Sequence, residues 1–203
     1  KVYIAANFFG SGWQALIGLL FVPFYIKFMG VEAYGLVGIF IMIQTLAVVL
    51  DLGLSNAVNR EIARHSVLPG KDQAQEIRHL VRSLETIYWG IALLIGLMIV
   101  LISPYVAAYW IKAQNLPRET VQQAVFLMGL IMALHWPASL YVNGLYGLQR
   151  HVLLNAANVL LATFRGIGAI VILWLISPTI QAFFIWQVLV SGTFTLILAR
   201  LLW

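Results

Sequence analysis

The residue with the clearest chemistry in this chain is Arg165, an arginine near the middle of an apolar stretch. The stretch runs from Asn155 to Ile176, and a helix needs roughly 20 such residues to cross the hydrocarbon core of a membrane. A cation at the centre of a membrane helix costs about 2.5–3.5 kcal/mol on insertion scales, so it usually has a partner, a hydrated cavity or an anionic ligand. We predict a functional role for Arg165. The alternative is an arginine that only ties helices together.

The neighbours of Arg165 on its own helix indicate where its side chain points. At 100° per residue, one face collects small and polar residues, namely Asn158, Ala162, Arg165, Gly168 and Ala169. Large apolar residues lie elsewhere on the helix, namely Leu160, Phe164, Val171 and Trp174. The small and polar face should therefore look into a bundle or a cavity, and the large residues should meet lipid.

Other apolar stretches carry polar stripes of the same kind. The first stretch aligns Asn7, Ser11, Gln14, Gly18 and Tyr25, and the last one carries Gln187 and Ser191. Gln44 shares a face with Asp51 in the second stretch. Lipid does not tolerate such stripes cheaply, so they face other helices or water. A bundle around a hydrated cavity would use a stripe on every helix, and we predict Asn7, Gln14, Gln44 and Asn158 as lining residues.

Two acidic residues also fall in apolar stretches. Asp51 could pair with an arginine, cap a helix that starts after Gly53, or carry a coupling proton or cation. Glu85 lies near the start of the third stretch, where its carboxylate could extend back to the water. We group Asp51, Arg60 and Glu85 as candidates for a coupling site or a structural ion pair.

The motifs of the common enzymes and cofactor sites are absent. The chain has no HExxH, GxSxG, Walker A or GxGxxG motif, and no cysteine. Its four histidines have no metal-ligand spacing. We therefore predict neither an enzyme nor a cofactor or metal site.

Composition places the chain in a membrane. It has 203 residues, of which 62% are hydrophobic and 9% charged, whereas soluble domains carry about 25% charged residues. The several long apolar runs predict an all-α, polytopic transmembrane bundle. We expect six spans, at residues 3–25, 35–55, 84–102, 121–141, 155–176 and 180–199.

The cations predict the orientation. Eight lysines and arginines fall on one side of the six spans, namely Lys1, Arg60, Arg64, Lys71, Arg78, Arg82, Arg150 and Arg200. The other side has Lys27, Lys112 and Arg118. The side with eight should be cytoplasmic, with both termini on it. This rule already explains the basic residues, so we predict no nucleic-acid binding.

The connections are short except for one. Lys27–Tyr34 should link the first two spans, and 57–83 should form the largest cytoplasmic loop. In that loop Pro69–Gly70 indicates a turn, and Asp72 should cap an interfacial amphipathic helix that leads into the third span.

Four segments carry a resemblance to a known family. They are Asn7 with Trp13 and VPFYIKFMGVEAYGL (22–36), LDLGLSNAVNRE (50–61), LYGLQRHVLLNAAN (145–158) and TFRGIG (163–168). Together they resemble the N-terminal half of the Wzx-type polysaccharide flippases of the MOP exporter superfamily, which move O-antigen and teichoic-acid precursors.

The resemblance implies one lobe, residues 1–203, of a two-lobed transporter with a cavity that alternates its access. The implied substrate is an undecaprenyl-pyrophosphate-linked oligosaccharide in the bacterial cytoplasmic membrane, and Arg165 matches the cationic residues that meet the pyrophosphate. The implied partners are membrane lipid, a driving sodium ion or proton, and a C-terminal lobe or second copy. The alternatives are a membrane scaffold or lipid-binding subunit that transports nothing, and a MATE-type drug antiporter, which would favour acidic lining residues.

Overall fold

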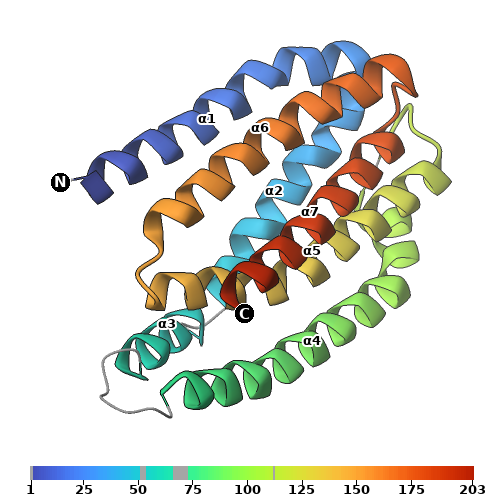
Figure 1. The fold of residues 1–203 in the computed structure, drawn as a ribbon. Coiled ribbons are helices and arrows are strands. Elements are labelled where there is room, and N and C mark those ends of the chain that lie inside the picture. Colours follow the sequence, from blue (N-terminus) through green and yellow to red (C-terminus); the bar gives the residue numbers. More distant parts are fainter. Residues whose placement is uncertain (1, 51–53, 66–72, 112) are drawn as a thin grey trace.

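Helices make up almost all of the chain that the computed structural model describes. The description covers residues 2–50, 54–65, 73–111 and 113–203, and it includes side chains at 12–13, 16–45, 56–64, 75–111 and 113–203. The helices in chain order are α1 (Val2–Met29), α2 (Val31–Leu50), α3 (Leu54–His65), α4 (Gln73–Tyr105), the π-helix η1 (Val106–Trp110), α5 (Arg118–Gly147), α6 (His151–Leu175) and α7 (Ile180–Leu202). Figure 1 shows their arrangement.

Helix length and hydropathy identify a multi-pass membrane protein. Within the described residues four helical segments are long and apolar enough to cross a bilayer, namely Gln75–Trp110, Arg118–Gly147, His151–Leu175 and Ile180–Leu202. The described parts of α1 and α2 add two shorter apolar helices, Leu16–Met29 and Val31–Thr45. The prediction of an all-α bundle of membrane helices is thus confirmed for these elements.

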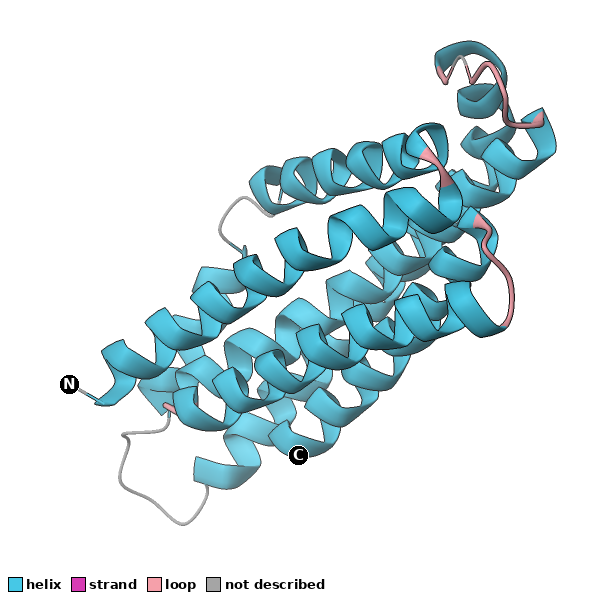
Figure 2. Ribbon diagram, turned by 90° about the horizontal axis from the view of Figure 1, so that it is seen from above, coloured by secondary structure: helices cyan, strands magenta, loops and turns pink. Residues whose placement is uncertain are grey.

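Helix α5 is the centre of the packing. It contacts α4 on one side and α7 on the other, while α3 packs against its C-terminal part. Helix α6 lies between α7 and α1, and Figure 2 shows the long helices running along one another with short connections. The N-terminus, α3 and the C-terminus all lie at the same end of the bundle (Figure 1).

Two connections differ from the sequence predictions. The predicted link Lys27–Tyr34 is wrong, because α1 runs to Met29 and α2 starts at Val31, so Gly30 alone turns the chain. Gly30 has a φ of +86°, which glycine adopts without steric cost. The predicted interfacial helix and third span form one continuous helix, α4, which begins at Gln73; Asp72 itself lies outside the described residues.

An acidic side chain connects the N-terminal end of α2 to the segment before α5. The carboxylate of Glu32 accepts the backbone N–H of Asn115, with N–O distances of 3.0 and 3.1 Å, and also the N–H of Gln114. Gln114 and Asn115 precede α5, so this contact ties the start of α2 to the segment between η1 and α5. A carboxylate in the first turn of α2 also interacts favourably with the positive, N-terminal end of the helix dipole.

Replacing Gly30 should destabilise the fold through backbone strain alone. Gly30→Ala would put a Cβ where no atom lies within 4 Å, so its cost comes from the left-handed φ, about 1–2 kcal/mol. Gly35→Ala in α2 is the matched control, since it also meets open space but in helical geometry. Thermal unfolding in detergent should show a lower midpoint for Gly30→Ala only; equal midpoints would contradict this account of the turn.

Candidate functional site

A polar cavity lies between α1, α2, α6 and α7. Its volume is about 310 Å³, and its wall is apolar except for a few side chains. The polar lining residues are Tyr25, Tyr34, Asn158, Arg165 and Gln187. Arg165 is the one charged side chain among the described residues that line it. The cavity therefore offers a cation, the phenol of Tyr34 and two amides as donors of hydrogen bonds to anionic or hydroxyl oxygens, and the phenol oxygen of Tyr25 as an acceptor.

Arg165 is held by a neutral partner. Its Nη2 donates to Oγ of Ser191 on α7 at 2.9 Å, and its buried Nε has no hydrogen-bond partner among the described residues. No described carboxylate lies within ion-pair distance of its guanidinium. Because burial of a charge without a counterion is costly, an anionic ligand would stabilise a guanidinium that has no carboxylate partner among the described residues.

Two glycines explain how the helices come together around Arg165. A Cβ at Gly166 would lie 2.2 Å from Cε2 of Phe21 on α1, and one at Gly168 would lie 2.1 Å from Cζ2 of Trp186 on α7. The TFRGIG sequence thus lets α1 and α7 approach α6 on either side of the arginine.

Side chains of both neighbours then bond to the backbone of α6. Nε1 of Trp186 donates to the carbonyl of Arg165 at 3.1 Å, and the phenol of Tyr25 donates to the carbonyl of Gly166 at 3.3 Å. One helical turn before them, Nε1 of Trp13 donates to Oγ1 of Thr163 at 3.0 Å. These contacts fix the rotation and the height of α6, and so the place of the guanidinium in the cavity.

The predicted orientation of α6 is confirmed. Ala169 is fully buried, and Asn158, Ala162 and Arg165 line the cavity. The large apolar residues point outward, with Leu160, Phe164, Val171 and Trp174 all exposed. The 3.6-residue period is sufficient to find this division because each side of the helix has its own composition.

The other predicted lining residues have mixed outcomes. Asn158 and Arg165 lie in one cavity, while Gln44 is half-buried in α2 and is not part of that lining. The side chains of Asn7 and Gln14 lie outside the described residues, although α1 includes both positions. Their role as lining residues stays a prediction.

Of the three candidates for an ion pair, the structure describes Arg60 and Glu85, and these two do not contact each other. Arg60 is exposed on α3 and forms no salt bridge with Glu85. Glu85 turns inward from α4 and accepts the phenol of Tyr141 on α5, which in turn accepts Nε1 of Trp89 at 3.3 Å. Asp51 lies outside the described residues.

Sequence reasoning missed Tyr34 as a site residue. The predicted link placed it in a loop, whereas the turn at Gly30 puts it one helical turn into α2 and on the cavity wall. Its signal was available, because a glycine followed by an acidic residue and an apolar run is typical of a helix end and a new start.

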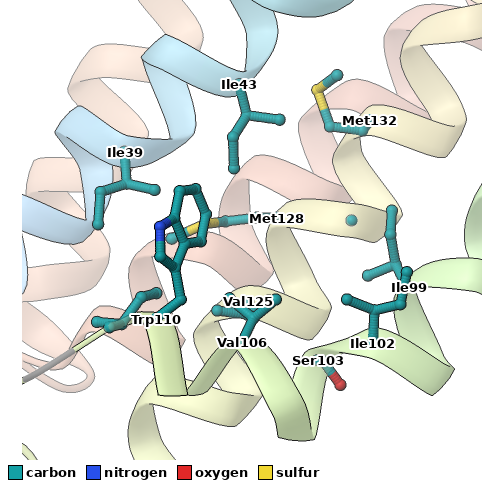
Figure 3. A pocket seen from close by; sticks show the side chains of 12 residues that line it. Ile39, Ile43, Ile99, Ile102, Ser103, Val106, Trp110, Val125, Met128 and Met132 are labelled. Atoms are coloured by element: carbon teal, nitrogen blue, oxygen red, sulfur yellow. The ribbon is translucent and has the colours of Figure 1, made fainter. Parts of the chain in front are cut away.

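A second, smaller cavity has no polar function of this kind. It lies between α2, α4, η1 and α5 and has a volume of about 150 Å³. Figure 3 shows apolar side chains converging on it, among them Ile39 and Ile43 of α2, Ile99 and Ile102 of α4, and Met132 of α5. An apolar void of this size binds no sugar or phosphate, so the cavity at Arg165 is the candidate site.

Enlarging Gly166 should disturb the site by separating α1 from α6. Gly166→Ala forces its methyl group against the ring of Phe21, and such overpacking costs about 1–3 kcal/mol. A second change, Phe21→Leu, should recover much of the loss, which thermal unfolding of the single and double variants would measure. Gly96→Ala, where nothing lies within 4 Å of the new methyl, is the control. Additive effects of Gly166→Ala and Phe21→Leu would refute the proposed contact.

Comparison with known proteins places nearly the whole chain in one family. A family model described as "Polysaccharide biosynthesis protein" matches residues 4–203. No curated protein and no solved structure matches the chain.

Proposed function

The chain belongs to the polysaccharide biosynthesis protein family, a Wzx-like flippase family, and we propose that it forms one lobe of a lipid-linked oligosaccharide flippase. Members of this family are typically transporters rather than enzymes. The proposed substrate is an undecaprenyl-pyrophosphate-linked oligosaccharide, which the transporter moves to the outer leaflet of the bacterial cytoplasmic membrane. The proposed reaction breaks no bond and needs only a site that alternates between two sides.

The observation that carries this proposal is the charge of the cavity. Arg165 is bonded to the neutral hydroxyl of Ser191, and no described carboxylate neutralises it. The chain has no aspartate or glutamate after Glu119, so neither α6 nor α7 can supply a counterion. A guanidinium in a cavity of lowered dielectric constant attracts a pyrophosphate more strongly than a surface arginine would.

The same charge argues against a drug exporter. A cavity for cationic drugs would be expected to carry acidic residues, whereas the charged side chain among the described lining residues is an arginine. A scaffold that transports nothing would gain nothing from a cavity whose cation has no carboxylate partner among the described residues, since burying that charge only costs stability.

The proposal also assigns a topology and a place in a larger transporter. It takes α1 and α2 as two further spans beside the four long ones, which makes six spans in residues 1–203 with both termini cytoplasmic. A C-terminal lobe or a second copy would close the other side of the cavity. A sodium ion or a proton would drive the change of access.

Substitution of Arg165 tests the proposed role. Arg165→Ala should abolish export of the glycan while the protein stays in the membrane. Arg165→Lys should retain part of the activity, because lysine keeps the charge but lacks the planar guanidinium that binds phosphate through two N–H groups. The measurement is glycan on the cell surface together with the amount of protein in the membrane.

The control is Arg118→Ala, which removes an exposed cation at the start of α5 and should leave export unchanged. Normal export by a well-expressed Arg165→Ala protein would refute the contact with substrate. Loss of the protein itself in Arg165→Ala and in Arg165→Lys would favour an arginine that only ties helices together.

Single cysteines test the topology, since the chain has no cysteine of its own. A cysteine at Arg64, which is exposed on α3, should resist an impermeant thiol reagent in intact cells, and one at Asn115 should react. Both should react after the cells are opened. Labelling of position 64 but not 115 in intact cells would reverse the orientation.

A further inference from the structure

An apolar groove runs along the side of α6 that faces away from α1. It lies between α6 and α7, has a volume of about 480 Å³ and is lined almost entirely by hydrocarbon. Small side chains at Ala156 and Ala157 widen it on the α6 side, and Phe194 and Ile197 form part of its α7 side. Helices α6 and α7 contact each other. Because its lining is apolar, the groove suits a hydrocarbon chain.

Two arginines belong to the helix ends next to this groove, Arg150 at the start of α6 and Arg200 in the last turn of α7. Nη1 of Arg150 donates to the carbonyl of Leu201 at 2.9 Å, and Leu201 is itself a groove residue. Arg200 follows in the last turn of α7, and both arginine side chains are exposed.

The backbone adds to this positive charge. Arg150 is the N-cap residue of α6 and makes no side-chain capping bond, so the first N–H groups of α6 face the same end. No acidic residue follows Glu119 in the sequence, so α6 and α7 carry only positive charge. The groove is thus apolar along its length and positively charged at one end. This combination is complementary to an amphiphile with a hydrocarbon chain and an anionic headgroup.

We propose that the α6–α7 groove binds an anionic phospholipid of the cytoplasmic leaflet, with an acyl chain between the helices and its phosphate at Arg150 and Arg200. Basic pockets between membrane helices on the cytoplasmic side bind anionic headgroups in this way. Binding of this phospholipid is a property beyond transport and does not depend on the proposed substrate.

The position of the groove gives the bound lipid a consequence for the candidate site. Leu161 lines both the groove and the cavity of Arg165, so one helix separates the two. An acyl chain in the groove would pack against α6 on the side opposite α1. Lipid binding should therefore stabilise the helix that carries Arg165.

The test is native mass spectrometry of the purified full chain in micelles with phosphatidylglycerol or phosphatidylcholine. The unaltered chain should retain phosphatidylglycerol preferentially. The double variant Arg150→Gln/Arg200→Gln should bind it about 25-fold more weakly, from the usual contribution of a basic residue at an anionic surface. Ala156→Trp, which fills the groove and leaves both charges, should reduce binding of both lipids.

The matched control is Arg64→Gln/Arg82→Gln, which removes two exposed cations at the same end of the bundle but outside the groove. It should bind phosphatidylglycerol like the unaltered chain, and circular dichroism should show equal helix content in all variants. Equal retention of the two lipids, or equal loss in the control pair, would overturn the proposal. Displacement of bound phosphatidylglycerol by equimolar undecaprenyl phosphate would assign the groove to the prenyl lipid and would overturn it too.

Discussion

The burial of one positive charge at membrane depth is the constraint on which the rest of this structure depends. A guanidinium among apolar helices must be hydrogen-bonded and given polar surroundings, because an isolated charge there is very costly. The chain meets this demand with Ser191 on α7 and with a cavity that Tyr25 and Asn158 help to line. The demand is met only in part, since Nε of Arg165 has no partner among the described residues. In the proposed function, an anionic substrate would supply the missing partner.

Close helix contact is the means by which the arginine is held in place. In a membrane the hydrophobic effect does not drive helices together, so tight packing and hydrogen bonds between helices must do so. Gly166 and Gly168 permit that packing on α6, and Gly129, Gly144 and Gly147 do the same on α5. On α6 each close approach is paired with a hydrogen bond to the backbone, from Tyr25 on one side and from Trp186 on the other.

Helix α6 separates two environments of opposite character. Its inward side lines a polar cavity with α1 and α2, and another side forms an apolar groove with α7. The polar side follows from its sequence, in which small and polar residues share the face of Arg165, whereas the groove side combines Leu160 and Phe164 with Ala156 and Ala157. In the proposed function and the proposed lipid site, these two surfaces would meet the headgroup and the hydrocarbon chain of membrane lipids.

The sequence by itself determined the class of the protein and the inward direction of Arg165. Hydropathy and the helical period are local properties, and they report which side of a helix avoids lipid without reference to any neighbour. The partners of those faces came only from the tertiary structure. The bond of Arg165 to Ser191, the inward turn of Glu85 to Tyr141 and the place of Tyr34 on the cavity wall each depend on which helices are adjacent and at what height. The helical period does not show which of several apolar helices of similar length are neighbours. The close contacts at glycines and the one-residue turn at Gly30 select one arrangement among them.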